Sequence, residues 1–355
     1  MTDALPPSGT PDPVERRSRL LGVKLQVLVA AHAGAEPIEP ELGSFPNGAA
    51  LVVDRSAWVL VDGSAERALG GALAWAIRHG ATSLDLIADT DTGLLARRAE
   101  RLSFPVRVWF AQERSLLAAV TEPLAVPPPP SPEHLELVGV IDAAGATPNV
   151  EHAVVFGEVR GLEVCRVVDQ PTVGHIVELD VDPAAVAAAA GRPFDGVQLE
   201  VGVGVNDREA FRLVHGEIPT AEALATVVES VARFRTADAP QHPLNRLGQE
   251  RYLRWELEQD PASIGMATVV PAEPPLPRPN LKDPVPCVAI GVDSDGTERV
   301  VVCSMGVDID LVGFVADVQA MHEAPVVVVV RERDLVPITR NLLDLLATPV
   351  DVRTV

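Results

Sequence analysis

The chain has 355 residues, of which 47% are hydrophobic and 22% are charged, a composition typical of globular rather than disordered proteins. Its formal net charge of −21 at pH 7 predicts a surface that repels polyphosphate, so nucleic-acid partners and anionic membrane surfaces are both disfavoured. The length allows two or three domains, each with its own core.

The first residues of the given sequence do not have the pattern of a signal peptide. Residues 1–14 are polar and proline-rich, without the apolar core of a signal peptide. No uncharged apolar run reaches the ~18 residues that a membrane span needs. Cys165, Cys287 and Cys303 form no C-x-x-C pair, which argues against a disulfide framework and against a structural zinc site. We therefore predict a cytoplasmic protein with reduced thiols and no membrane partner.

Two proline-rich stretches mark the expected domain boundaries. Residues 127–130 are consecutive prolines, which form a stiff and extended linker, and a second proline-rich connector covers residues 270–286. The sequence thus divides into a disordered tail at 1–15, an N-terminal α/β lobe at 16–122, a linker at 123–134, a middle α+β domain at 135–266, a second linker at 267–285 and a C-terminal α/β lobe at 286–355.

The N-terminal lobe combines a hairpin with alternating strands and helices. Residues 16–31 allow either a short helix or a strand-like lead-in, and the sequence does not decide between them. Gly80 is well placed to end a helix, because glycine adopts the left-handed conformation that follows many helices. The predicted elements are strands at 51–54 and 58–61, a helix ending at 79, a strand at 84–88, a helix ending at 102 and a strand at 106–110.

The middle segment has a different order of predicted elements, with strands before most of its helices. Residues 153–159 and 162–168 predict a hairpin around a turn at 160–161. Alternating apolar residues at 197–204 predict a half-buried strand. The remaining predicted elements are a strand at 175–181 and helices at 183–190, 208–215, 220–234 and 244–257.

The C-terminal lobe repeats the order of elements of the N-terminal lobe. Leu69 and Gly71 fall on Leu311 and Gly313 at the same spacing, without a gap. The sequence therefore predicts an α/β fold in which two repeated β-α-β-α-β lobes flank a mixed α+β middle domain. Because a three-stranded half-sheet leaves an edge open, we expect the two lobes to pack against each other. The predicted elements are strands at 287–292 and 299–303, a helix from 308, a strand at 326–330, a helix at 337–347 and a strand at 350–355.

Four carboxylates follow neighbouring strands of the N-terminal lobe. Asp62 and Glu66 come after one strand, and Asp89 and Asp91 come after the next. Ligands bind at the carboxyl ends of parallel strands and magnesium prefers oxygen ligands, so these residues are candidates for a metal site. The pattern is similar to the acidic site of toprim domains, although one β-α unit is missing between the two elements. The alternative is that Asp and Thr cap the helix that starts near Gly93.

Three glutamates of the middle segment form a second candidate site with a catalytic role. In a tight hairpin Glu158 lies opposite Glu163, and Glu200 lies on the polar face of a later strand. Opposed carboxylates repel each other unless a cation or an arginine lies between them. With magnesium or manganese the cluster would suit metal-assisted phosphoester hydrolysis. The alternative is a solvated sheet face on which Arg160 and Arg166 compensate the charge.

One stretch of the chain is locally basic. His242, Arg246, Arg251 and Arg254 lie on or beside the helix predicted at 244–257, and they are candidates for binding an anion or a phosphate group. The alternative is an amphipathic helix that packs on the middle domain through its leucines.

The sequence leaves two functions open. The first is a non-catalytic α/β protein that binds a small molecule or a protein partner through its repeated lobes. The second is a divalent-metal-dependent phosphoesterase or nuclease that uses the clustered carboxylates and the arginine-rich helix. The two differ in one spatial property, which is whether the carboxylates converge within about 5–6 Å around a point open to solvent.

Overall fold

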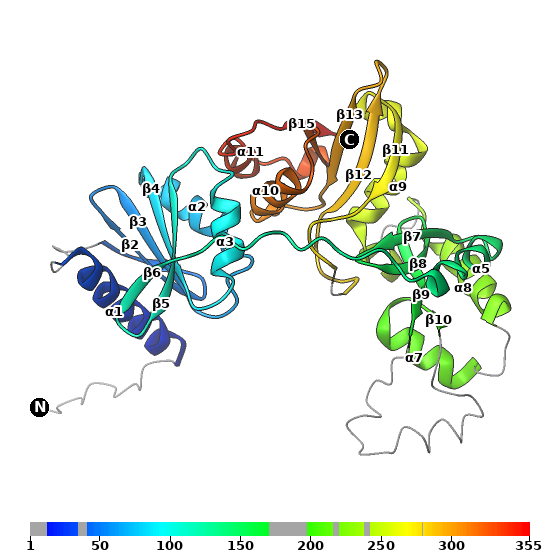
Figure 1. Ribbon diagram of the computed structural model, residues 1–355, viewed down its shortest axis with the longest axis horizontal. Helices are drawn as coiled ribbons and strands as arrows, with labels where there is room; N and C mark the ends of the chain where they lie inside the picture. Colours follow the sequence, from blue (N-terminus) through cyan, green and yellow to red (C-terminus); the bar gives the residue numbers. More distant parts are fainter. Residues whose placement is uncertain (1–12, 35–40, 170–196, 216–219, 238–241, 279) are drawn as a thin grey trace, which may run out of the picture. The chain divides into compact units, whose positions relative to one another are not determined.

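The computed structural model describes residues 13–34, 41–169, 197–215, 220–237, 242–278 and 280–355 (Figure 1). Within these residues the chain is a mixed α/β protein, which confirms the predicted fold class. None of the helices in this part of the chain combines the length and the apolar character that a membrane span requires. The strand predicted at 175–181 and the helix predicted at 183–190 lie outside the described residues, as do residues 1–12 of the predicted tail.

The chain folds into two compact units, and each is assembled from separate stretches of sequence. The C-terminal segment supplies helices to the first unit and strands to the second. The domain boundaries expected from the proline-rich stretches stay a prediction. The first unit comprises residues 1–124, 307–321 and 336–350, and the second comprises residues 125–306, 322–335 and 351–355.

A six-stranded sheet forms the centre of the first unit. Across the sheet the strands are β1 (Glu41–Phe45), β2 (Gly48–Val53), β3 (Ser56–Val61), β4 (Ser83–Ala88), β5 (Val106–Gln112) and β6 (Ser115–Ala118). The middle strands β3, β4 and β5 run parallel, and antiparallel hairpins extend the sheet at both edges. β3 and β4 consist almost entirely of buried residues, as expected for parallel strands that are covered on both faces.

The first helix, α1 (Pro13–Ala33), covers one face of this sheet (Figure 1). Its buried side chains recur at helical spacing, and Leu25 and Leu28 pack in one apolar cluster with Leu51 and Trp58. The open question about residues 16–31 is thereby decided in favour of a helix.

The other face of the sheet is covered by two layers of helices. α2 (Leu69–Arg78) and α3 (Thr92–Ala99) pack directly on the strands. α10 (Leu311–Met321) packs on both of these helices, and α11 (Pro337–Leu343) packs on α2. Helices from the two predicted lobes therefore pack against each other within the first unit, whereas the strands of the predicted C-terminal lobe belong to the second unit.

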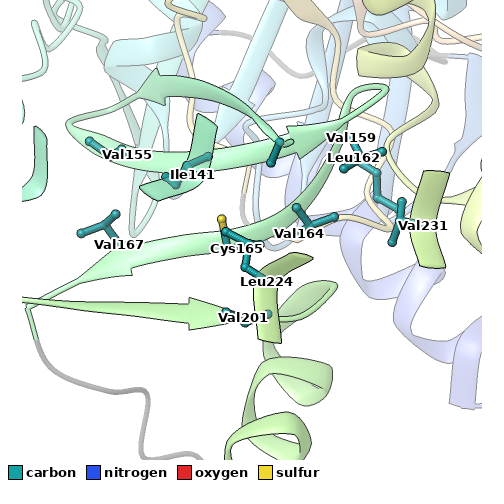
Figure 2. Packing of buried hydrophobic residues seen from close by; sticks show 11 residues of the cluster. Ile141, Val155, Val159, Leu162, Val164, Cys165, Val167, Val201, Leu224 and Val231 are labelled. Atoms are coloured by element: carbon teal, nitrogen blue, oxygen red, sulfur yellow. The ribbon is translucent and has the colours of Figure 1, made fainter. Parts of the chain in front are cut away.

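The second unit begins with a four-stranded antiparallel sheet. In order across it the strands are β10 (Gln198–Val201), β9 (Leu162–Val168), β8 (Val154–Val159) and β7 (Thr147–Glu151). Figure 2 shows Ile141 of α5 (Val138–Ala143) and Leu224 and Val231 of α8 (Thr220–Phe234) among the buried side chains of β8 and β9. The other helices in this part of the unit are α4 (Pro132–Leu135) and α7 (Gly204–His215).

A five-stranded sheet completes the second unit. Its strands, in order, are β11 (Met266–Ala272), β12 (Cys287–Asp293), β13 (Glu298–Cys303), β14 (Val326–Val330) and β15 (Asp351–Thr354). β11, β12 and β13 are antiparallel, whereas β13, β14 and β15 run parallel. α9 (Gln249–Gln259) packs on the antiparallel strands through Leu253 and Leu257. Short 3-10 helices lie at η2 (Pro243–Arg246), η3 (Pro261–Ile264) and η4 (Glu332–Asp334).

Both large sheets contain the same order of a hairpin followed by two parallel strands. In the first sheet this order is β2, β3, β4 and β5, and in the second it is β12, β13, β14 and β15. The agreement extends to the order of elements along the chain. The equivalence of the two segments as one structural repeat stays a prediction.

Some predicted elements differ from the structure in their bounds. The single helix predicted at 244–257 is divided into η2 and α9, because Leu247 is extended and Gly248 adopts a left-handed φ of +51°. The linker predicted at 267–285 begins inside β11, an edge strand that tolerates Pro271. β1, β6 and β7 form where the sequence did not predict strands, and the helix predicted from 308 begins at Leu311.

Candidate functional site

A cavity of about 720 Å³ opens in the first unit beside α2. One face of this helix and of the turn before it forms the floor, since the lining positions recur every three or four residues. Three of the floor residues are small, and their short side chains leave the space that larger residues would fill. The floor residues are Arg67, Ala68, Gly71, Ala74, Trp75 and Arg78.

The walls of the pocket come from segments that are distant in sequence. Phe45, the last residue of β1, and Asn47, from the turn that follows it, form one wall, and Ile309 and Ile338 line another part of the pocket. A β-carbon on Gly71 would lie 3.6 Å from Cδ1 of Ile309 and 3.8 Å from Cζ of Phe45, so both side chains reach over the floor at this point. The pocket surface is therefore mainly apolar and partly aromatic.

The Trp75 indole is held in position from two sides. A β-carbon on Gly43 of β1 would lie 2.5 Å from the Trp75 ring, so the indole packs directly on the backbone of this strand. On its other side the ring stacks with His79, with 4.0 Å between the ring centroids. An aromatic surface fixed in this way is available to a ligand at little cost in side-chain entropy.

The segment that carries Ile309 is anchored to α2 by backbone packing. A β-carbon on Gly70 would overlap the carbonyl oxygen of Ile309, so only glycine allows the two backbones to approach so closely. The guanidinium of Arg67 donates to Asp308 Oδ1 at 3.2 Å and to Asp310 Oδ2 at 3.3 Å. Ile309 thus lies between two carboxylates that are bound to one arginine.

Burial and the nearby carboxylate of Asp308 raise the pKa of Asp310 to about 6, although Arg67 opposes this shift. Its folded-state pKa therefore lies well above the ordinary value of 3.8, so keeping this carboxylate charged at neutral pH destabilises the folded protein.

The acidic residues predicted for a metal site lie at the end of the sheet, where they have other partners. Asp62 pairs with Arg17 at 2.6 Å, and Asp89 pairs with Lys24 at 3.5 Å. Asp91 does not cap α3 with its side chain, so the capping alternative is wrong for this residue.

Asp91 Oδ2 instead accepts a hydrogen bond from the Ala65 backbone at 3.0 Å, which ties two loops together. Glu66 contributes its carbonyl oxygen to Arg98. In the described part of the chain, no group of three or more His, Cys, Asp and Glu residues is arranged to hold a metal ion.

The glutamates of the middle sheet face arginines. Glu158 and Glu163 are cross-strand partners in the β8–β9 hairpin, which confirms the predicted register. Both oxygens of Glu163 accept from Arg166 at 2.9 Å. Arg208 lies between Glu163 and Glu200, at 2.9 Å from the first and 3.5 Å from the second. Arginines therefore compensate the opposed carboxylates in this structure.

The other side of this network comes from α9. Arg254 donates to Glu158 at 2.6 Å, and Arg251 lies 3.4 Å from the other oxygen of Glu158. Both arginines also pair with Glu151 of β7. Burial opposes the charge of Arg254, but Glu158 and the other facing groups, which include Glu151 and Glu258, together outweigh it and raise the pKa of the guanidinium. The acidic and the basic candidates from the sequence are thus partners of each other.

The remaining residues of the basic stretch lie outside this network. His242 stacks on Phe234, with ring centroids 4.7 Å apart, and its Nδ1 accepts a hydrogen bond from the backbone of Leu244. Arg246 belongs to η2 and is separated from α9 by the turn at Gly248. The four residues proposed to bind an anion therefore do not form one surface on a single helix.

Arg235 is a buried cation that lies upstream of these anion candidates in the same basic stretch. Its guanidinium is fully buried and donates to the carbonyl oxygens of Arg160, Leu244, Leu247 and Gly248. Burial lowers its pKa to about 10, because carbonyl oxygens replace only part of the lost hydration. No local pattern marks such a residue, since its partners are backbone atoms of a turn and of an irregular segment.

Comparisons with known proteins do not assign the chain to a family. No protein-family model matches it, and the searches of curated proteins and of solved structures give no match. The function is therefore argued from the geometry of the chain itself.

Proposed function

We propose that this chain is a non-catalytic binding protein that holds a small, mainly apolar molecule in the pocket beside α2. The pocket volume of about 720 Å³ lies within the range of small-molecule sites, which is roughly 300–1,000 Å³. Its lining combines aromatic and branched apolar side chains with a few polar groups, the usual composition of such sites.

One observation carries this proposal, namely that small residues on α2 create the space. Ala68, Gly71 and Ala74 all point to the pocket, while Trp75 and Phe45 offer flat apolar surface next to it. Burying apolar ligand surface contributes about 25 cal/mol per Å², so a modest ligand gains useful affinity here without any reacting group. The pocket also joins segments of both predicted lobes, as binding through these lobes requires.

Nuclear magnetic resonance of the tryptophan indole groups tests the proposal with the neutral probe decan-1-ol. The chain has four tryptophans, and a Trp75→Phe variant assigns the indole signal of Trp75. We expect decan-1-ol to shift the Trp75 signal and not that of Trp255, which belongs to the second unit.

Ala74→Leu should weaken binding of this probe by about tenfold, because the larger side chain occupies the floor. Ala31→Leu makes the same change on the exposed surface of α1 and should leave the affinity unchanged. A Trp75 signal that does not respond to decan-1-ol, or an equal response in both variants, would exclude this pocket as the binding site.

Metal-dependent phosphoester hydrolysis, the second function suggested by the sequence, gains no supporting observation from the site geometry. Glu158, Glu163 and Glu200 are each at most 8% exposed and face arginines rather than an open space. Its dependence on magnesium or manganese therefore stays a prediction that metal titration can test.

A further inference from the structure

We infer that the ligand of this pocket is an amphipathic anion, whose apolar body lies against Trp75 and whose charged group pairs with Arg78. This inference rests on the proposed function and adds the chemical class of the ligand. It starts from the two arginines of the pocket floor, which differ in their partners.

Arg67 and Arg78 lie at opposite ends of the floor. Arg67 already binds Asp308 and Asp310, so its positive charge is compensated within the protein. Arg78 is exposed at the last position of α2, and among the described residues no carboxylate forms an ion pair with it. Within the described part of the chain, the floor therefore has one guanidinium that forms no ion pair and can face a ligand.

Arg78 lies at the carboxyl end of α2, and its charge decides whether this end of the pocket favours an anion or a cation. The helix dipole places about half a negative charge there, which on its own would favour a cationic ligand. The guanidinium carries a full positive charge beside the same helix end, so the sum favours an anion. A cation stacked on Trp75 would gain the attraction of the ring face but would be repelled by Arg78.

The net charge of the rest of the protein restricts where an anion can bind. With a formal net charge of −21, the surface as a whole repels anions, and an anion binds only where a local positive group compensates it. The apolar part of the ligand explains why it would stay at this site. Both features are needed for a preference for amphipathic anions, because an exposed ion pair contributes little affinity and an apolar molecule gains nothing from the charge of Arg78.

Three probes with the same alkyl chain test the inference, namely decanoate, decan-1-ol and decylammonium. Affinities are measured at neutral pH from the indole signal of Trp75. We expect decanoate to bind about fivefold more tightly than decan-1-ol, the size of one exposed ion pair, and decylammonium to bind most weakly. About 1 M sodium chloride should remove the preference for decanoate but not the binding of decan-1-ol, because salt screens charge.

Arg78→Gln assigns the preference to one residue. In this variant decanoate should bind no more tightly than decan-1-ol. Arg114→Gln removes the same charge from an exposed turn of the same unit that does not line the pocket, and it should keep the preference.

The outcomes separate the inference from the proposed function. If decan-1-ol binds at Trp75 but decanoate binds no more tightly, the anion inference is wrong and the apolar pocket remains. The inference is also wrong if decylammonium binds most tightly, or if Arg78→Gln keeps the preference for decanoate. If neither decan-1-ol nor decanoate binds, the proposed function fails and the inference fails with it.

Discussion

Glu158 and Glu163 lie directly opposite each other in the β8–β9 hairpin, and both carboxylates are buried. Two like charges in this position destabilise a sheet unless they are compensated. Each glutamate has its own arginines, with Arg254 on Glu158 and Arg208 on Glu163. Ion pairs with these arginines thus offset the repulsion, and they connect the sheet to α7 and α9.

Removing one arginine from the buried side of this network should be costly. Arg254→Met keeps most of the side-chain volume but removes the closest ion-pair partner of Glu158 and the second partner of Glu151. We expect the free energy of unfolding in urea to fall by about 3–5 kcal/mol, the usual effect of breaking a buried ion pair from one side. Arg166→Met is the matched control, because the Arg166 side chain is 34% exposed and its loss should cost only about 1 kcal/mol. Equal losses would show that burial does not set the strength of these pairs.

Divalent metals should leave the melting temperature unchanged. The arginines already compensate the carboxylates, so magnesium or manganese finds no excess negative charge to bind at this point. For the same reason Glu163→Gln should lower the melting temperature, since it leaves the buried Arg208 with a weaker partner. A melting temperature that rises with manganese in the native protein and not in Glu163→Gln would contradict this prediction and support a metal site at the glutamates.

A second buried ion cluster links α3 to α10. Asp317 is fully buried and accepts hydrogen bonds from Arg97 at 3.0 Å and from Arg98 at 2.8 Å. Asp317→Ala leaves two buried guanidinium groups without their counter-ion. The free energy of unfolding should therefore fall by about 3–5 kcal/mol in urea denaturation. Asp344→Ala removes an exposed carboxylate and should change it by less than about 0.5 kcal/mol. A small effect of Asp317→Ala would mean that water reaches the two arginines.

Asp310 should make the protein less stable as the pH rises. Its folded pKa of about 6 exceeds the unfolded value of 3.8, so the folded state holds a proton that the unfolded state releases between these values. This contribution is complete below about pH 4 and is lost as the pH passes about 6, at a cost of about 3 kcal/mol. Asp310→Asn should therefore be more stable than the native protein at pH 7.5 by about this amount and similar to it near pH 4. Asp344→Asn should keep the native pH dependence, and the same result for Asp310→Asn would contradict the assignment.

The three thiols should be unreactive in the folded protein. Cys165, Cys287 and Cys303 are all buried, and burial raises the pKa of Cys165 to about 12. Because only the thiolate attacks a disulfide reagent, Ellman's reagent should modify none of them until the protein is denatured. All three should then react, which serves as the internal control. Rapid reaction of one thiol at neutral pH would show that its part of the core opens.

Local patterns in the sequence predict the elements whose burial is simple. β14 is a run of five valines, all buried, and such a run in a short segment indicates a central parallel strand. The hairpin of β8 and β9 follows from a single turn signal, and this signal was enough to place Glu158 opposite Glu163. The fold class and the compensation of the opposed glutamates by arginine could therefore be predicted.

Contacts between distant residues could not be predicted in the same way. Nothing near Asp317 shows that Arg97 and Arg98 will surround it, since the pairing depends on how two helix layers meet. The pocket could not be predicted from the sequence for the same reason. Gly71 has the pattern of an ordinary helix residue, and only the fold places Phe45 and Ile309 over it. The strand β11 was not predicted because it contains Pro271. Proline is excluded from central strands, but it is tolerated on an edge strand such as β11.

The division of the chain between its two units has a consequence for synthesis on the ribosome. Residues 1–124 emerge first and contain every strand of the first sheet, yet α10 and α11 are made only after residues 125–306. At about 5–20 residues per second, this delay amounts to roughly 10–40 s. During that time α2 and α3 lack the helices that cover them, and Arg97 and Arg98 lack their counter-ion. A nascent chain released at residue 306 would keep its whole first sheet and still be unable to complete either unit.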